Sequence, residues 1–487
     1  MSQPPPETPP DAGLDVGLPV EYGGTSELRG PLLVLRGVSG VSWDEFATIR
    51  TAPEDVPGGT GGAAGSGGEL RHGLVLEVNR DLAVVQVLQG TDGLVPRTTR
   101  VSFTGSPMRV PVGAGWLGRI CNGRGEPIDG GPPISGTATA PVAGHPLNPT
   151  HRDPPAEPVL TGISTIDALT TLVRGQKLPI FSVAGLPHLE LAAQIAAQST
   201  AGDEPFSVVF AAMGLTHADA DAVRAALEER SAARELLLLL NTADDPVIER
   251  ILTPRIALTV AEHLAFELHR HVLVVLADMT SYAEALREVS AARGEMPGRR
   301  AYPGNLYSDL ASLYERCGRI RGTTGSVTVL PVLTMPAGDI THPVPDLTGY
   351  ITEGQIVLAP DVHARGIYPP IDPLSSLSRL MRSGAGPGRT RDDHLELAAQ
   401  LLAALARARQ ARELAEIIGA SGLSGTDQLY LDFATQFEQR LANQHPGERR
   451  TLDETLDRCW DVATVLPTRE LTMLSTRFLD AHPRTED

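Results

Sequence analysis

Residues 178–198 have the strand–turn–helix layout of a phosphate-binding P-loop. An apolar segment at residues 178–183 enters a glycine-containing turn, and a helical pattern follows at residues 189–198. In a working P-loop, the pattern G-x-x-x-x-G-K-[ST] places backbone amides and a lysine ammonium on the phosphates and a hydroxyl on Mg²⁺. The turn in this chain reads Ser-Val-Ala-Gly-Leu-Pro-His-Leu over residues 182–189.

The groups that grip phosphate and metal are missing from this turn. Ser182 and Pro187 stand at the two glycine positions, and a proline has no N–H to offer a phosphate. His188 stands at the lysine position, and Leu189 has no atom that ligates a cation. Ser182, Gly185 and His188 therefore mark a degenerate phosphate loop, which we expect to hold nucleotide weakly or not at all.

Two other residues indicate that the catalytic parts are absent or displaced. Lys177 is the only lysine of the chain, and it lies before the loop rather than in it. Leu215 follows a glycine after the apolar segment 207–211, where a nucleotide hydrolase of this architecture would place a glutamate that orients or deprotonates the attacking water. A leucine does neither.

Asp278 ends a second apolar segment and has two interpretations. In P-loop enzymes an aspartate at this point helps to organise Mg²⁺ and its waters. However, Leu189 supplies no hydroxyl to share the cation, and Ser281 with Glu284 fits an S-x-x-E capping box at the start of the next helix. We expect the structural role.

Arg379 is the candidate for action on a nucleotide held by another chain. A lone arginine on a helical segment is usually a solvated charge or the partner of a carboxylate. Arg379, however, lies just after the proline-rich residues 368–373, between an α/β region and a helical region. A guanidinium is a fixed fork of donors suited to phosphate oxygens. Supplied across an interface between subunits, it accelerates phosphoryl transfer by about 10³–10⁵. Arg299 and Arg300 lie in a turn-rich loop that is either simply polar or an interface.

Composition limits the partners of the chain. It has 487 residues, with 59 acidic and 41 basic side chains and a formal net charge of −18, which argues against general affinity for nucleic acid or anionic lipid. Its three cysteines follow no metal-ligand spacing, and we expect no metal site. No apolar run approaches the ~18 residues of a membrane span. We expect a cytoplasmic protein that reaches a membrane only through partners.

The pattern along the chain predicts a multidomain fold. Prolines dominate residues 1–20, which we expect to be a disordered tail. Short strands with turn signals predict a small β-barrel at residues 21–97, with a glycine-rich insert at residues 57–68. Alternating strands and helices predict an α/β, RecA-like domain with a mostly parallel sheet at residues 98–370. Helical periodicity alone remains at residues 371–487 and predicts a helical domain. The strand candidates of the α/β domain are residues 179–183, 207–211, 236–241, 272–278 and 327–334. Helices are expected between them, for example at residues 218–233 and 254–269.

Longer segments make the resemblance to one family specific. They are Glu21-Tyr22-Gly23, Phe103-Thr104-Gly105, the residues 179–188, 278–293, 297–300 and 341–355, and Pro373-Leu-Ser-Ser-Leu-Ser-Arg-Leu-Met381. With these segments the chain resembles the non-catalytic B subunits of the V-type and A-type rotary ATPases over about residues 21–480. The proline-rich start and the glycine-rich insert are mild departures.

The resemblance implies a role inside a larger machine. Three B-like chains would alternate with three catalytic A chains in an A3B3 head, joined to central and peripheral stalk subunits. ATP or ADP, with Mg²⁺, would be held mainly by the A chain, and the arginine finger that completes the site from the B side maps onto Arg379. The complex would couple ATP synthesis or hydrolysis to H⁺ or Na⁺ transport, and the chain alone would have no activity.

Three other classes of protein share parts of this pattern. An F-type alpha subunit has a similar frame but keeps a full P-loop with its lysine. A flagellar or secretion ATPase, or a Rho-like helicase, needs its own catalytic groups, and an RNA-tracking surface conflicts with the net charge of −18. A stand-alone nucleotide-binding pseudoenzyme is the serious rival. Gel filtration with and without the A partner separates it from a ring subunit.

Overall fold

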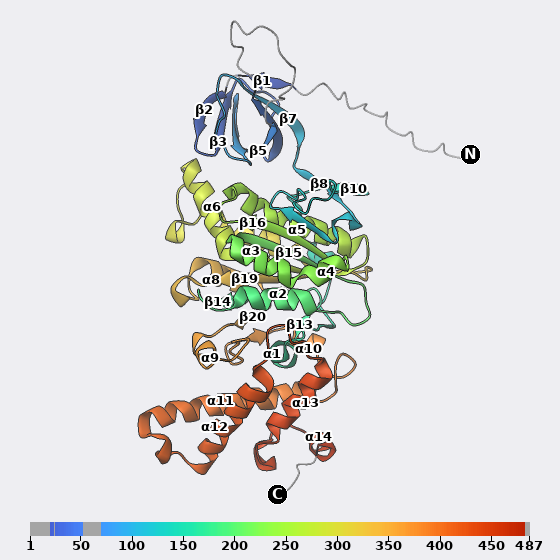
Figure 1. Ribbon diagram of the computed structural model, residues 1–487, viewed down its shortest axis with the longest axis vertical. Helices are drawn as coiled ribbons and strands as arrows, with labels where there is room; N and C mark the ends of the chain where they lie inside the picture. The colour runs from blue at the N-terminus through green and yellow to red at the C-terminus, as the bar shows by residue number, and fades with distance from the viewer. Residues whose placement is uncertain (1–19, 24, 52–69, 483–487) are drawn as a thin grey trace, which may run out of the picture. The chain divides into compact units, whose positions relative to one another are not determined.

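The computed structural model describes residues 20–23, 25–51 and 70–482. The expected disordered tail, apart from Val20, and the glycine-rich insert at residues 57–68 lie outside these residues. The chain divides into two compact units, Met1–Met108 and Arg109–Asp487, and Figure 1 labels the elements of both.

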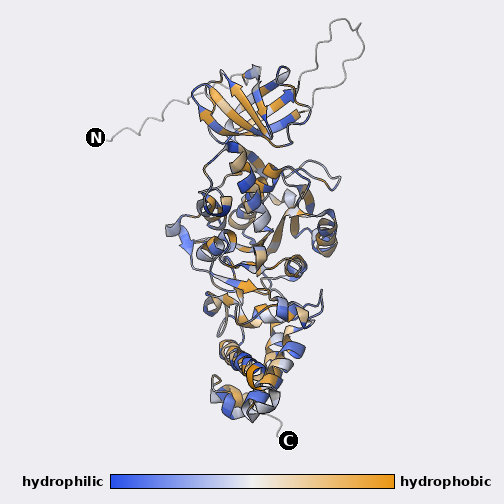
Figure 2. Ribbon diagram, turned by 90° about the vertical axis from the view of Figure 1, so that its left-hand side faces the viewer, coloured by the Kyte–Doolittle hydropathy of each residue, from blue (hydrophilic) through white to orange (hydrophobic). Residues whose placement is uncertain are grey.

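The first unit is one antiparallel sheet that wraps around its own core. Its strands are β1 (Glu21–Gly23), β2 (Thr25–Arg29), β3 (Leu32–Arg36), β4 (Glu45–Thr51), β5 (Leu70–Asn79), β6 (Leu82–Val87) and β7 (Thr99–Pro107), in the order β1-β7-β4-β5-β6-β3-β2. Alternate side chains such as Ala47 and Ile49 point into a core of leucine and valine. Apolar strands are orange in Figure 2. The predicted β-barrel is confirmed, but it extends beyond the predicted end at residue 97, because β7 pairs with β1 and β4.

The second unit contains a sheet that is mostly parallel, as predicted, and that has ten strands where five were expected. Its strands are β9 (Arg119–Asn122), β11 (Arg152–Asp153), β14 (Ile180–Ser182), β15 (Phe206–Leu215), β16 (Leu236–Thr242), β17 (His271–Ala277), β18 (Gly318–Ile320), β19 (Ser326–Thr334), β20 (Gly354–Val357) and β21 (Leu377–Ser378). The main path is β21-β20-β14-β19-β17-β15-β16-β9. Strand β21 is antiparallel to β20, and β18 is antiparallel to β19. Two short pairs lie beside the sheet: β8 (Arg109–Val112) with β10 (Ala138–Pro141), and β12 (Pro158–Val159) with β13 (Leu172–Val173).

Helices cover the sheet because its strands are apolar on both sides. Strand β15 sends Val208 and Phe210 into a core shared with α2 and α3, while Val209 faces the other way. Figure 1 shows α2, α3 and α4 in front of the sheet. The helices of this region are α1 (Ser164–Leu169), α2 (His188–Gln198), α3 (His217–Ala226), α4 (Glu228–Ala232), α5 (Val247–Phe266), α6 (Met279–Arg293), α7 (Leu306–Tyr314), α8 (Pro343–Ile351), α9 (Pro360–Ala364) and α10 (Met381–Gly384).

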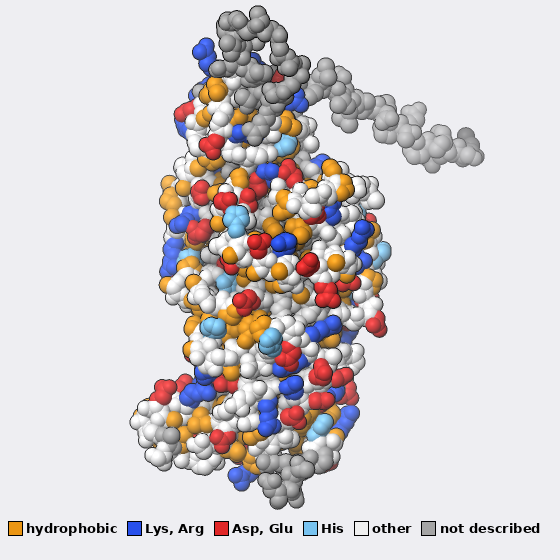
Figure 3. All heavy atoms as spheres, in the orientation of Figure 1, with side chains coloured by type: hydrophobic (Ala, Val, Ile, Leu, Met, Phe, Trp, Pro, Cys, Tyr) orange, Lys and Arg blue, Asp and Glu red, His pale blue; other side chains and the backbone are white. Residues whose placement is uncertain are grey.

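The carboxyl-terminal part is helical, as predicted, but the predicted start at residue 371 is too early, because β21 at Leu377–Ser378 still belongs to the central sheet. Its helices are α11 (His394–Ile418), α12 (Gly425–Phe437), α13 (Leu452–Ala463) and α14 (Thr476–Ala481), with a π-helical turn at Glu438–Ala442. Helices α11, α12 and α13 bury Leu401, Phe433 and Trp460 in one core. No helix in residues 20–23, 25–51 and 70–482 has the length and apolar character needed to cross a membrane. Acidic and basic side chains are interspersed on the face drawn in Figure 3.

Candidate functional site

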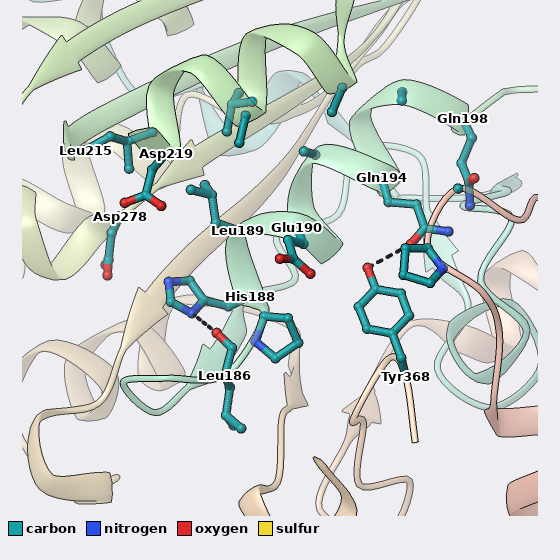
Figure 4. Close-up of a pocket in the computed structure, with 18 of the residues that line it drawn as sticks. Leu186, His188, Leu189, Glu190, Gln194, Gln198, Leu215, Asp219, Asp278 and Tyr368 are labelled. Carbon is teal, nitrogen blue, oxygen red and sulfur yellow. Dashed lines mark hydrogen bonds between the residues drawn. The ribbon is translucent and has the colours of Figure 1, made fainter. Parts of the chain in front are cut away.

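The degenerate loop connects β14 to α2, where a phosphate loop would lie. The Leu186 amide donates to the Val183 carbonyl at 3.2 Å, and the His188 amide donates to the Leu186 carbonyl at 2.8 Å. His188 Nδ1 lies 2.9 Å from the same Leu186 oxygen, so the imidazole folds back on the loop, as Figure 4 shows. Pro187 has no amide hydrogen. Three positions of the turn therefore offer no free backbone amide to a phosphate.

The three residues predicted for the loop lie in different surroundings. Ser182 is fully buried, and its Oγ donates to the Val183 carbonyl at 3.2 Å. Gly185 is exposed and has φ +88°, a left-handed conformation that favours glycine. Of the three, His188 alone is in the lining of the adjacent pocket described below.

A pocket of about 730 Å³ opens beside this loop. Its walls come from the loop and α2, from the end of β15 with α3, and from Tyr368. Further lining residues are Glu229 in α4, Asp278 after β17, Ser281 in α6, and residues 446, 447 and 449. Tyr368 Oη donates to Gln194 Oε1 at 2.9 Å across one side (Figure 4). A volume of this size accommodates an organic ligand.

The charge of the lining disfavours a triphosphate. Apart from Asp278, whose pKa is raised by burial, the acidic side chains among the described lining residues are Glu190, Asp219 and Glu229, against the single guanidinium of Arg449. A carboxylate about 4 Å from a phosphate charge repels it by about 1 kcal/mol in water and about 4 kcal/mol at an effective dielectric of about 20. With no lysine in the loop to offset it, this repulsion acts against nucleotide binding.

The two positions at which a nucleotide hydrolase would carry its catalytic carboxylates both line the pocket. Asp278 follows β17, and β17 pairs with β15, the strand that ends at Leu215; Figure 4 labels both residues. Leu215 is the last residue of β15 and is largely buried. No group of three His, Cys, Asp or Glu side chains that could hold a metal occurs in the part of the chain that the structure describes.

Asp278 has a structural role, as expected, but the expected capping box is wrong. Helix α6 begins at Met279 with Asp278 as its N-cap. Asp278 Oδ1 accepts from the Thr280 amide at 2.6 Å, and Oδ2 accepts from Thr334 Oγ1 at 2.6 Å. Burial raises the pKa of the Asp278 carboxyl. Ser281 lies inside the helix because the carboxylate earlier in the chain takes the capping position.

Arg379 lies directly after the edge strand β21 and is exposed. Its backbone is fixed, because its amide donates to the Glu353 carbonyl at 3.0 Å. Its guanidinium has no hydrogen-bond or ion-pair partner within the described residues of the chain. The structure thus presents a fixed main chain at the edge of the central sheet, and from it an arginine side chain whose donors meet no other described residue.

Arg299 and Arg300 hold their loop to the chain that precedes α8. Arg299 Nη2 donates to the Thr341 carbonyl at 3.0 Å, and Arg300 Nη2 donates to Asp339 Oδ2 at 2.8 Å. These bonds give both arginines an internal role in addition to their partial exposure.

The wall of the pocket formed by Tyr368 and Arg449 has no signal in the sequence. Tyr368 and Gln194 are 174 residues apart in the chain, and Arg449 comes from the carboxyl-terminal part. The residues near Tyr368 are proline-rich, and this pattern does not indicate that the tyrosine hydroxyl bonds to Gln194 in α2.

Comparison with known proteins gives consistent results along the chain. Residues 26–105 match the beta-barrel domain of the ATP synthase alpha/beta family, and residues 162–378 match the nucleotide-binding domain of that family. Residues 383–483 match the C-terminal domain of V and A type ATP synthase.

Two relatives are similar over most of their length. The B subunit of the A-type ATP synthase of Aeropyrum pernix is 52% identical over 467 residues, which cover 95% of this chain and 98% of that protein. The solved structure of the ATP synthase subunit NeqB from Nanoarcheaum equitans is 39% identical with a TM-score of 0.68, covering 81% of this chain and 94% of that one.

Proposed function

Because this chain belongs to the B-subunit family of A-type ATP synthases, within the ATP synthase alpha/beta family, we propose that it is the non-catalytic member of a rotary head. In this proposal it alternates with catalytic A subunits in an A3B3 hexamer. ATP and Mg²⁺ lie at the interface and are held mainly by the A subunit, and Arg379 completes the site in trans.

The observation that carries this proposal is that the Arg379 side chain is exposed and has no partner among the described residues. Its guanidinium is exposed and bonds to no other residue that the structure describes, so its donors are available to a neighbour. A carboxylate partner within the chain would have indicated a structural ion pair instead. Because the guanidinium stays charged and is planar, it matches the oxygens of a phosphoryl group in transfer.

The chain's own pocket supports the non-catalytic half of the proposal. The loop lacks the phosphate-binding lysine and hydroxyl, and Leu215 replaces the carboxylate that would activate water. The acidic lining of the pocket adds repulsion against a triphosphate. The family's nucleotide is therefore assigned to the interface rather than to this pocket, which binds it weakly or not at all.

A place in the rotary head implies further subunits of the same complex. We infer that central and peripheral stalk subunits connect the hexamer to a membrane sector, through which ATP synthesis or hydrolysis is coupled to H⁺ or Na⁺ movement. The chain itself then touches the membrane only through these subunits.

The test is the Arg379→Ala substitution in the assembled hexamer. Turnover is measured per assembled complex, after a native gel has checked its composition. The expected result is normal assembly, a kcat lowered by about 10³ or more, and a much smaller change in ATP binding. Near-normal kcat in assembled Arg379→Ala complexes would refute the finger assignment.

The remaining alternative is a stand-alone nucleotide-binding pseudoenzyme. Gel filtration of the chain with and without a catalytic A subunit separates the two functions. A ring subunit co-elutes with its partner as a hexamer, whereas a stand-alone regulator keeps its own elution volume and binds nucleotide by itself.

A further inference from the structure

Lys177 lies buried between two carboxylates. The residue is 3% exposed, and its Nζ lies 2.5 Å from Glu353 Oε1 and 3.5 Å from Glu315 Oε1. Its backbone is also tied to Glu353. The Lys177 amide donates to Glu353 Oε2 at 2.8 Å, and the Glu353 amide donates to the Lys177 carbonyl at 2.9 Å. The only lysine of the chain therefore fixes both the side chain and the main chain of Glu353.

Glu353 in turn fixes the main chain of Arg379. Its carbonyl accepts the Arg379 amide at 3.0 Å and Gln176 Nε2 at 3.1 Å. Gln176 Nε2 also donates to Ser378 Oγ at 2.9 Å, and Ser378 Oγ donates to the Thr171 carbonyl at 3.0 Å. Gln176 is fully buried. A closed network thus connects Lys177 and Gln176 to the residue before Arg379 and to Arg379 itself.

The edge strand that precedes Arg379 needs such support. Strand β21 has two residues, and it pairs with β20 through Gly354 opposite Ser378 and Gln355 opposite Leu377. A two-residue edge strand frays unless other bonds hold it. A misplacement of about 1 Å in a catalytic group costs about a hundredfold in rate. Loss of the bonds that hold this strand from outside should therefore lower the catalytic rate.

We propose that Lys177 and Gln176 are positioning residues for Arg379, and that they hold its main chain, through Glu353 and Ser378, in the orientation that serves the neighbouring catalytic site. This inference rests on the proposed function of Arg379 as a finger in trans. Lys177, the only lysine of the chain, lies before β14 and in this proposal acts on catalysis through Arg379. The lysine of a working P-loop would lie after β14 and would bind phosphate directly.

The test compares Lys177→Met and Gln176→Leu in the assembled hexamer. The first removes the ammonium and leaves carboxylates that water can reach, because the side chains of Glu353 and Glu315 are 27% and 38% exposed. The second cuts the bonds to Glu353 and Ser378, and also the bond that Gln176 Oε1 accepts from the Val173 amide, without changing any charge. Each is combined with Arg379→Ala, and Arg124→Met is the matched control, since it removes an ion pair with Glu249 near the opposite edge of the sheet.

The expected result is a kcat lowered about tenfold to a hundredfold for both variants, with the KM for ATP changed by less than about threefold. Lys177→Arg, which retains a cation, recovers part of the rate. In the Arg379→Ala background neither variant lowers kcat further, and Arg124→Met keeps the kcat of the parent in assembled complexes.

Three results would overturn the inference. The first is a normal kcat for both variants while Arg379→Ala is inactive, and this leaves the proposed function standing. The second is an equal loss in the presence and absence of Arg379, which indicates a general structural effect. Normal turnover by Arg379→Ala itself refutes the proposed function and, with it, this inference.

Discussion

The carbonyl oxygen of Leu186 accepts the backbone amide of His188 at 2.8 Å, and the Nδ1 of the same histidine lies 2.9 Å from it. In a working P-loop the residue at position 188 would be a lysine that reaches out to phosphate. Here the side chain turns back and bonds to its own loop. The loop is therefore satisfied internally, and a phosphate would have to displace these bonds before it gained any.

The first prediction concerns nucleotide affinity. Calorimetric titration of the isolated chain with Mg-ATP should give a dissociation constant weaker than about 1 μM, which corresponds to about −8 kcal/mol. The physical reasons are the internally bonded loop and the acidic lining of the pocket. The control is the same titration of a hexamer that contains the catalytic partner, where tight sites are expected. Binding at or below about 1 μM by the isolated chain would mean that other groups replace the missing ones.

The second prediction concerns turnover. The purified chain alone should hydrolyse ATP at less than about 1 s⁻¹, below the usual enzyme range. His188, Leu189 and Leu215 together remove the phosphate-binding cation, the metal-binding hydroxyl and the base. A coupled assay on the isolated chain checks this, with Arg379→Ala in the same chain as a control for contaminating ATPase. Steady turnover above that rate, proportional to chain concentration, would contradict it.

Much of the fold follows from apolar runs in the sequence. The strands β15, β16, β17 and β19 are predictable within a few residues, because strands buried on both faces are nearly continuous runs of valine, leucine and alanine. Such runs need no knowledge of distant residues.

Helix boundaries are less predictable where local signals compete. The helix predicted at residues 254–269 begins at Val247, because Pro254 is tolerated inside α5. The helix predicted at residues 218–233 is interrupted at Leu227, which ends α3 and precedes α4. Tertiary packing decides whether a helix continues through a proline or is interrupted at one residue, and a local sequence pattern does not report that packing.

The candidate site is likewise predictable from the sequence only in part. The loop at residues 182–189 and the loss at Leu215 are recognisable from spacing alone. The network of Lys177 is not, because its amide bonds to a carboxylate 176 residues away in the chain. Long-range polar contacts have no periodicity, and the sequence indicates only that the lysine is outside the loop.

The third prediction concerns pH. Burial raises the pKa of the Asp167 carboxyl from 3.8 to about 6, although Thr161 and Gly162 donate hydrogen bonds to it. The folded chain holds this proton where the unfolded chain has lost it. The stabilisation is thus complete below pH about 4 and is lost as the pH rises through about 6, by about 3 kcal/mol at most.

Asp167→Asn removes this titration. Urea midpoints measured from pH about 4 to about 7 should fall more steeply for the parent chain than for the variant. Asp203→Asn, which changes an exposed carboxylate, is the matched control and should keep the parent's profile. Parallel profiles for the parent and Asp167→Asn would show that the carboxyl titrates alike in both states.

The fourth prediction concerns the helical core. Phe433 is fully buried between α11, α12 and α13, so Phe433→Ala should lower the free energy of unfolding by about 3–5 kcal/mol. Ile417 is 81% exposed on α11, and Ile417→Ala should change it by less than about 0.5 kcal/mol. Chemical denaturation of the isolated chain, followed by circular dichroism, measures both. A similar small effect for both variants would mean that this core is loosely packed.

The fifth prediction separates charge from geometry at Arg379. Arg379→Lys keeps a positive charge on the edge after β21 but replaces a rigid fork of donors with one ammonium on a flexible stem. If the residue acts by donating two directed bonds to a phosphoryl group in transfer, the lysine variant should remain well below the parent in kcat, closer to Arg379→Ala than to arginine. If Arg379 only supplies a field at the interface, lysine should restore most of the rate.

The comparison must be made in the assembled hexamer, because in the isolated chain the guanidinium meets no partner among the described residues. The KM for ATP is the second readout. A finger that acts in the transition state lowers kcat and kcat/KM together, whereas a residue that binds ground-state nucleotide raises KM. Full recovery of kcat by lysine, or an effect confined to KM, would contradict the geometric role. Because the Arg379 side chain has no bond to lose within residues 20–23, 25–51 and 70–482, a loss of the chain's own stability does not imitate the expected result.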